Sequence, residues 1–194
     1  CVTWSVGLRA PSWHDLASAW LEAVTENLTE AGQYRDPDLA LQEVSAEIRT
    51  EVFQTIRDRI EAALHGTGTD AFRARIGALL TEPKEHLEVV HRQPPWSEAR
   101  ILQTLRDQGR LWRNGASRLL FCRAADAGGR DILFANGESH ALAPGNAEFL
   151  ALLCRMPGID ADTIMPWLSD SDRSALLCRL FNDGHFAASE DDIA

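Results

Sequence analysis

The chain has 194 residues, of which 45% are hydrophobic and 25% charged, ordinary values for a soluble globular protein with one large or two small domains. No basic stretch followed by an apolar run opens the sequence, and no apolar run approaches the ~18 residues that span a membrane, which excludes a signal peptide and a membrane segment. The formal net charge of −10 disfavours binding to phosphate backbones, unless Lys and Arg gather on one face.

The opening residues read as a single β-strand. Residues 2–8, VTWSVGL, are rich in β-forming side chains, and residues 9–11 end the strand with a proline. No partner strand follows nearby. We therefore expect the chain to be a fragment whose upstream part is missing.

Three helices are predicted between residues 12 and 80. Ser12 and Asp15 resemble a capping box, and apolar residues at helical spacing then run to about Thr29. Residues 33–46 have no clear period. A long amphipathic helix follows over residues 48–64, and a third, capped by Thr69, ends before Pro83.

Pro94 and Pro95 mark a domain boundary, after which the pattern becomes mixed. Ser97 starts a helix that Gly109 closes. Strands are predicted at 119–122, 131–135 and 139–142, with Asn136-Gly137 as a two-residue hairpin turn. Helices are predicted at 147–155 and 171–182, with a short one at 162–168 between them and a last strand at 184–187. This order is the one a winged-helix-like domain requires.

The cysteines indicate a reducing compartment. Cys1, Cys122, Cys154 and Cys178 form no CxxC pair and are scattered through apolar runs. We expect buried, reduced thiols in a cytoplasmic protein and neither a disulfide framework nor a zinc site.

Five segments, in the same order, resemble the bacterial JmjC/cupin-type ribosomal oxygenases, the family of 50S ribosomal protein arginine hydroxylases. Residues 4–11, WSVGLRAP, resemble the YSVGFRAP motif that closes the family's cupin core. The other four are YRDPDL at 34–39, LTEPK at 80–84, ANGE at 135–138 and FNDGHF at 181–186. Together the segments cover nearly the whole chain.

The resemblance implies a mainly α fold with a small α+β part. Residues 1–11 would be the last strand of a truncated JmjC/cupin core, 12–93 a helical dimerisation domain, and 94–194 a winged-helix-like domain. It also implies a parent enzyme that uses Fe(II) and 2-oxoglutarate to hydroxylate an arginine of a large-subunit ribosomal protein. This piece alone is expected to be inactive.

No catalytic or metal-binding residue is expected in this chain. Non-haem Fe(II) oxygenases need two His and one carboxylate on one face of the metal. The only candidate is His86-Leu87-Glu88 with His91, which we assign to a polar stretch before the proline-rich linker. The resemblance places a polar side chain of the opening strand near 2-oxoglutarate. Thr3 or Ser5 could be that residue, or an ordinary strand hydroxyl.

A homodimer is the expected oligomeric state, because three helices alone make a small core and an excess apolar face can be shared across a two-fold interface. The predicted interface residues are Leu16, Trp20, Val52, Phe53, Ile56 and Ile60.

A winged helix raises the possibility of DNA binding, which the charge disfavours. Residues 158–194 contain eight acidic residues and two arginines, Arg173 and Arg179, so the net charge is 2 − 8 = −6. The basic residues gather instead between 106 and 130, at Arg106, Arg110, Arg113, Arg118, Arg123 and Arg130. They could face ribosomal RNA or be solvated. The alternative function is a non-enzymatic dimeric winged-helix adaptor or transcription regulator.

Overall fold

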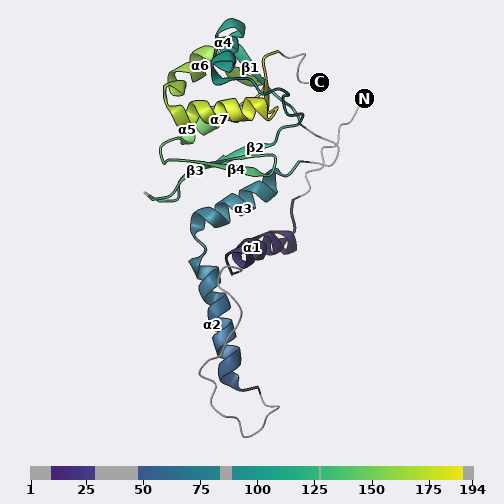
Figure 1. Ribbon diagram of the computed structural model, residues 1–194, viewed down its shortest axis with the longest axis vertical. Coiled ribbons are helices and arrows are strands. Elements are labelled where there is room, and N and C mark those ends of the chain that lie inside the picture. The colour runs from purple at the N-terminus through teal and green to yellow at the C-terminus, as the bar shows by residue number, and fades with distance from the viewer. Residues whose placement is uncertain (1–9, 29–47, 84–88, 127, 190–194) are drawn as a thin grey trace, which may run out of the picture. The chain divides into compact units, whose positions relative to one another are not determined.

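The computed structural model describes residues 10–28, 48–83, 89–126 and 128–189 (Figure 1). The chain divides into two compact units, Cys1–Ile76 and Gly77–Ala194. The expected opening strand and the YRDPDL segment lie outside the described residues. The functional boundaries at residues 11 and 93 stay predictions.

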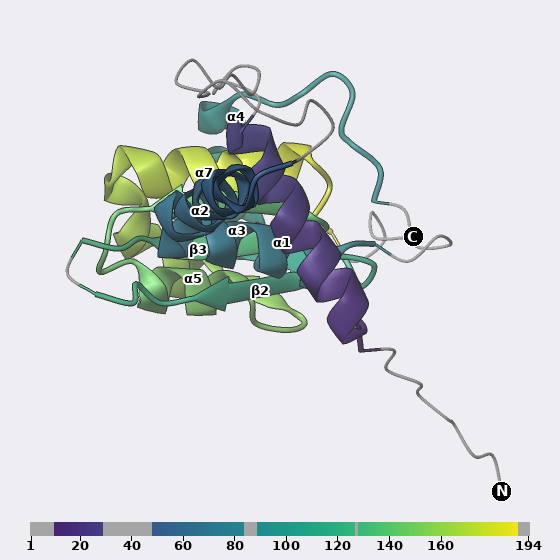
Figure 2. The ribbon, with the colours of Figure 1, turned by 90° about the horizontal axis from the view of Figure 1, so that it is seen from below.

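The described part of the first unit is helical. It contains α1 (Trp13–Leu28), α2 (Thr50–Gly66) and most of α3 (Thr69–Thr81). Helix α1 contacts α2, and it buries Ala19 and Val24. All three helices were predicted from the 3.6-residue spacing of their apolar side chains. Figure 2 looks nearly along the axis of α2 and shows α1 (purple) running at an angle to it.

The second unit begins with the end of α3 and continues into α4 (Glu98–Gln108). Ser97 caps the start of α4 by accepting a hydrogen bond from the Arg100 N–H. Gly109 ends the helix in the left-handed region at φ 73°, where a side chain would be strained. The start of this helix at Ser97 and its end at Gly109 were both predicted from the sequence, and both predictions are confirmed.

A three-stranded antiparallel sheet, with strand order β2-β3-β4, follows. Its strands are β2 (Leu119–Cys122), β3 (Asp131–Ala135) and β4 (Glu138–Leu142). The predicted Asn136-Gly137 hairpin is confirmed: Ala135 pairs with Glu138, and both turn residues have positive φ, at 44° and 91°. Every residue of β3 is buried, so this central strand is covered on both of its faces.

A second sheet, with strand order β5-β1-β6, joins parts that are distant in sequence. Strand β1 (Arg110–Arg113) pairs antiparallel with β5 (Gly158–Asp160) and with β6 (Phe186–Ala187). The sequence pattern predicted only β6. Strands β1 and β5 were missed because RLWR and GID are too short and too polar to show alternation.

The remaining helices complete the core of the second unit. They are α5 (Ala147–Leu153), α6 (Ala161–Ile164), the 3₁₀ helix η2 (Met165–Ser169) and α7 (Ser171–Asn182). Phe149, Leu177 and Phe181 are fully buried and pack with strand residues such as Leu111 and Leu133. The predicted order of helix, hairpin, helices and final strand is confirmed.

A buried carboxylate connects the sheet to the helices. Asp131, at the start of β3, is 2% exposed and accepts hydrogen bonds from the N–H groups of Ala124 (2.7 Å) and Asn146 (2.6 Å). Asn146 in turn accepts a hydrogen bond from the Arg173 guanidinium on α7. The polar groups that the fold buries here are therefore satisfied by one another.

Among the described residues, the helices are too short or too polar to cross a lipid bilayer.

Candidate functional site: an exposed apolar helix face

Helix α2 carries a row of apolar side chains that stay exposed among the residues that the structure describes. None of its residues is buried, and Phe53, Ile56 and Ile60 are 59%, 40% and 47% exposed. Their spacing of three and four residues places these side chains on one face of the helix. Arg57 and Glu61 form an i,i+4 ion pair at 3.6 Å. An amphipathic helix normally buries its apolar face, so this face is a candidate binding surface.

The other three predicted interface residues are half-buried. They are Leu16, Trp20 and Val52. The Trp20 ring meets the Phe72 ring edge-on, with 5.0 Å between the ring centroids. At least part of Trp20 therefore packs within the chain. The participation of all six residues in a dimer interface stays a prediction.

Arg75, which the sequence analysis did not single out, ties α3 to α1. Its Nε donates to the Ala19 carbonyl at 3.1 Å, and its Nη2 lies 2.6 Å from the Glu22 carboxylate. An arginine at such a position gives no sequence signal, because its partners are 56 and 53 residues away. These contacts fix α1 against the start of α3.

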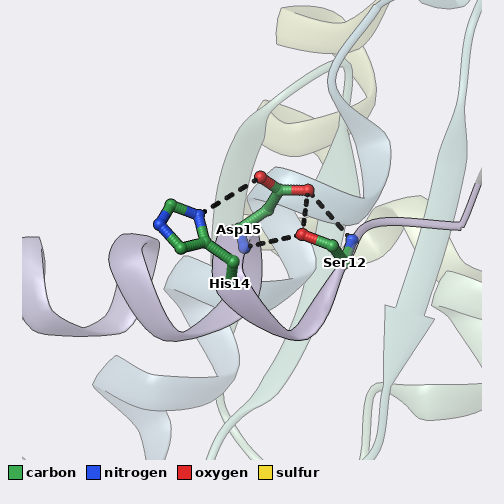
Figure 3. Close-up of polar contacts among 3 residues, drawn as sticks. All are labelled: Ser12, His14 and Asp15. Carbon is green, nitrogen blue, oxygen red and sulfur yellow. Dashed lines mark hydrogen bonds and ion pairs between the residues drawn. The ribbon is translucent and has the colours of Figure 1, made fainter.

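The His14-Asp15 pair belongs to a helix cap (Figure 3). The Asp15 N–H donates to the Ser12 hydroxyl at 3.1 Å, and the Asp15 carboxylate accepts from the Ser12 hydroxyl and N–H at 2.7 and 2.9 Å. These hydrogen bonds from Ser12 lower the pKa of Asp15, with a smaller contribution from His14, 3.9 Å away. The predicted capping box is confirmed.

No three His, Cys, Asp or Glu side chains come together to hold a metal ion in the parts of the chain that the structure describes. His91 lies 3.4 Å from Asp183 and is mostly exposed. His86, Leu87 and Glu88 lie outside the described residues, as do Thr3 and Ser5, so the expected contact with 2-oxoglutarate stays a prediction.

His185 is a buried titratable group that sequence reasoning missed. It is 6% exposed, and its Nδ1 lies 2.9 Å from the hydroxyl of Ser117, which is also buried. Burial lowers the pKa of His185 to about 4, with the nearby Asp183 charge opposing the shift. The imidazole is therefore neutral at pH 7 and serves as part of the core.

Most of the arginines between 106 and 130 have partners inside the chain. Arg110 pairs with Asp160 at 2.7 Å and Arg123 with Glu148 at 2.8 Å. Two further arginines donate to backbone carbonyls: Arg113 donates to Cys154 and Ser117, and Arg118 donates to Glu82. These arginines therefore have structural roles within the fold.

The described cysteines, Cys122, Cys154 and Cys178, are thiols and form no disulfide. Burial raises the pKa of Cys154 and of Cys178 to about 11. Because the thiolate is the reactive form and both side chains are largely covered, both should react with a disulfide reagent about 10-fold or more slowly than an ordinary thiol of pKa ~8.5 at pH 8. In a thiol titration, Cys154 and Cys178 should be modified only after the protein has been unfolded. Their rapid modification in the native protein would contradict this prediction.

Comparison with known proteins identifies a family, a curated relative and similar solved structures. The family model of the ROXA-like winged helix matches residues 55–187. The ribosomal protein uL16 3-hydroxylase of Escherichia coli (strain K12) is 23% identical over 185 residues, which are 95% of this chain and 47% of that protein. The chain thus spans about half the length of this curated relative.

Solved structures of Escherichia coli YcfD match this chain. An X-ray structure of that protein aligns with a TM-score of 0.69 at 23% identity, covering 92% of this chain and 45% of the other. A structure of YcfD, a ribosomal oxygenase, with cobalt and 2-oxoglutarate aligns with a TM-score of 0.67 at 24% identity, covering 92% and 46%. At this identity the alignments show a shared fold.

Proposed function

This chain belongs to the ROXA-like winged helix family, and we propose that it is the C-terminal region of an Fe(II)- and 2-oxoglutarate-dependent oxygenase that hydroxylates an arginine side chain of a large-subunit ribosomal protein. The proposal rests on one observation. The Escherichia coli ribosomal protein uL16 3-hydroxylase aligns with 95% of this chain at 23% identity. Solved complexes of YcfD with cobalt and 2-oxoglutarate support this cofactor for the parent protein. The protein would act in the cytoplasm, where ribosomal proteins are found.

The described residues do not fit the metal. A facial set of two His and one carboxylate is the usual ligand set for this iron chemistry, and the described part of the chain brings no such set together. When bound, Fe(II) with 2-oxoglutarate supplies the oxidant for an unactivated carbon. We therefore assign this region the tasks of dimerisation and of framing the substrate, and no chemical step.

A gene deletion tests the proposed function of the parent protein. In the natural host, loss of the gene should lower the mass of one large-subunit ribosomal protein by one oxygen atom, and the intact gene should restore it. Intact-mass spectra of purified ribosomes would show the change. Identical masses in both strains would contradict the proposal and favour a non-enzymatic winged-helix adaptor.

The purified chain is expected to be inactive by itself. With Fe(II), 2-oxoglutarate and the ribosomal protein identified in the deletion strain, it should form no hydroxylated product and no succinate above a metal-free control. Mass spectrometry and succinate detection would check both. Product formation by these 194 residues would show that the chain holds a complete iron site.

The exposed face of α2 supports a homodimer. Replacing Phe53 and Ile60 by glutamate would place two charges in the interface and should raise the dissociation constant of the dimer about 30-fold or more, equivalent to a loss of about 2 kcal/mol. Sedimentation equilibrium would measure this constant. Gln54→Glu is the control, because it adds one such charge to the same helix outside the row of Phe53, Ile56 and Ile60.

The double variant should keep its fold, because both side chains are exposed in a single chain. A dimer that is unaffected by the double substitution, or a protein that is monomeric at all concentrations before substitution, would contradict the proposed interface. The net charge of −6 over residues 158–194, which include α7, makes duplex DNA an unsuitable ligand.

A further inference from the structure

The second unit contains two Asn-Gly pairs whose surroundings differ. Asn114-Gly115 comes directly after β1, and Asn136-Gly137 joins β3 to β4. Asparagine is among the thermally labile residues, and a following glycine has no side chain to crowd its own backbone nitrogen. That nitrogen can attack the carbonyl carbon of the asparagine side chain. The hydrogen bonds and backbone conformation of each pair decide whether it does so in the folded protein.

The Asn136-Gly137 pair is held in an unreactive geometry. The Gly137 N–H, which is the attacking group, donates to the hydroxyl of the buried Thr81 at 3.1 Å. The Asn136 N–H donates to the Arg118 carbonyl at 3.2 Å, and the Asn136 side-chain oxygen accepts from the Arg118 N–H at 2.7 Å. Both turn residues have positive φ, the left-handed conformation in which Cβ lies beside its own carbonyl oxygen and away from the next nitrogen. Ring closure at Asn136 therefore requires the hairpin to open.

The Asn114-Gly115 pair lacks these restraints. The Gly115 N–H is exposed and makes no hydrogen bond among the residues that the structure describes. A Cβ built on Gly115 would meet no atom within 4 Å, so this peptide group has room to rotate. The Ala116 N–H donates to the Asn114 side-chain oxygen at 2.9 Å. A donor at that oxygen stabilises the negative charge that develops there during the attack.

We propose that Asn114 deamidates spontaneously in the folded protein and that its products loosen β6 from β1, whereas Asn136 is protected by the end of α3. The Gly115 nitrogen loses its proton to solvent and bonds to Cγ of Asn114, the Cγ–Nδ2 bond breaks, and ammonia leaves. Water then opens the cyclic imide at either carbonyl, which gives aspartate or isoaspartate. Water is the only co-reactant, and no group is oxidised or reduced. The reaction does not depend on hydroxylase activity.

The contacts of Asn114 explain why its products loosen β6. Its Nδ2 donates to the Gly184 carbonyl at 3.1 Å, and its backbone N–H donates to the His185 carbonyl at 2.9 Å. A carboxylate oxygen in place of Nδ2 cannot donate, and it repels the Gly184 carbonyl. Isoaspartate also adds a carbon atom to the main chain directly after β1. Both changes act next to the Arg113–Phe186 pairing of β1 with β6.

Timed incubation of the 194-residue chain in mildly alkaline buffer tests the proposal. Proteolysis and mass spectrometry would give the aspartate and isoaspartate fractions at positions 114 and 136 separately. In the native protein, Asn114 should convert at least ~10-fold faster than Asn136, because Gly137 must first lose its hydrogen bond to Thr81. In urea, which unfolds both sites, the two rates should converge. Equal native rates, or an Asn114 that stays unmodified, would overturn the proposal.

Two variants each alter one of the two sites. Gly115→Val crowds the attacking nitrogen at an exposed position without positive φ, so it should slow conversion of Asn114 at least ~10-fold and leave Asn136 unchanged. Thr81→Val removes the hydroxyl that holds the Gly137 N–H and should speed conversion of Asn136. Thr81→Ser is the matched control, because it keeps the hydroxyl. An undiminished rate at Asn114 in Gly115→Val would rule out the imide route, whatever the stability of Thr81→Val.

Asn114→Asp reproduces one product and tests the effect on β6. It should raise the unfolding equilibrium constant about 10-fold, through the lost hydrogen bond to Gly184 and the repulsion that replaces it. Gln54→Glu is the matched control, since it makes the same change from amide to acid at an exposed position of α2. Urea unfolding would measure both constants. An Asn114→Asp protein as stable as the Gln54→Glu control would overturn the proposed loosening.

Discussion

Replacing Gly158 by alanine is expected to destabilise the second unit by about 3 kcal/mol or more, an effect at the upper end of that seen when a packed site is overfilled. Gly158 lies in β5 opposite Trp112 of β1. A Cβ at this position would overlap the carbonyl group of Leu111, which belongs to the backbone and cannot rotate away. The two strands must then separate, and the β5-β1-β6 sheet loses its central pairing.

Gly66→Ala is the matched control. Gly66 is the last residue of α2, and a Cβ there would meet no atom within 4 Å. The same substitution at Gly66 should be neutral or stabilise by up to about 1 kcal/mol, because alanine restricts the unfolded chain. Urea unfolding of both variants would measure the two effects. Equal effects would mean that β1 and β5 do not approach each other as closely as described.

Acidification is expected to remove about 3 kcal/mol from the unfolding free energy as pH falls from about 6.5 to about 4, through His185. Burial lowers the pKa of this imidazole to about 4 in the folded chain, whereas an exposed histidine has a pKa of 6.5. In this window the unfolded chain binds a proton that the folded chain does not. The stabilisation is therefore complete above pH 6.5 and is lost progressively down to pH 4. Burial shifts the pKa of His140 in the same direction.

The variant His185→Gln separates this effect from the titration of other groups. Glutamine can keep a hydrogen bond to Ser117 but does not titrate, so the slope of unfolding free energy against pH should become shallower in this window. His91→Gln is the control, since His91 is mostly exposed and pairs only with Asp183 among its described contacts. Denaturant titrations at fixed ionic strength would give the slopes. An unchanged slope in His185→Gln would show that His185 protonates freely in the folded protein.

Helix α2 leaves an apolar row exposed in the part of the chain that the structure describes. The hydrophobic effect favours any surface that covers such a row, and a second copy would supply a matching apolar face.

The sequence by itself determined the elements whose signals are local. The capping box of Ser12 and Asp15, the helical spacing from Phe53 to Ile60, the cap glycine at 109 and the Asn136-Gly137 turn each depend on neighbours within a few residues. The order of these elements was sufficient to predict a winged-helix-like domain, and the five family segments predicted a relationship to ribosomal oxygenases.

Only the tertiary structure decided what distant residues do together. Strand β1 exists because β5 and β6, about 50 and 75 residues away, supply its partners, and the four letters RLWR carry no such information. His185 is neutral because the fold buries it beside Ser117, 68 residues earlier. Pairing, burial and clefts depend on the packing of the whole chain, whereas caps, turns and helical periodicity depend on neighbours alone.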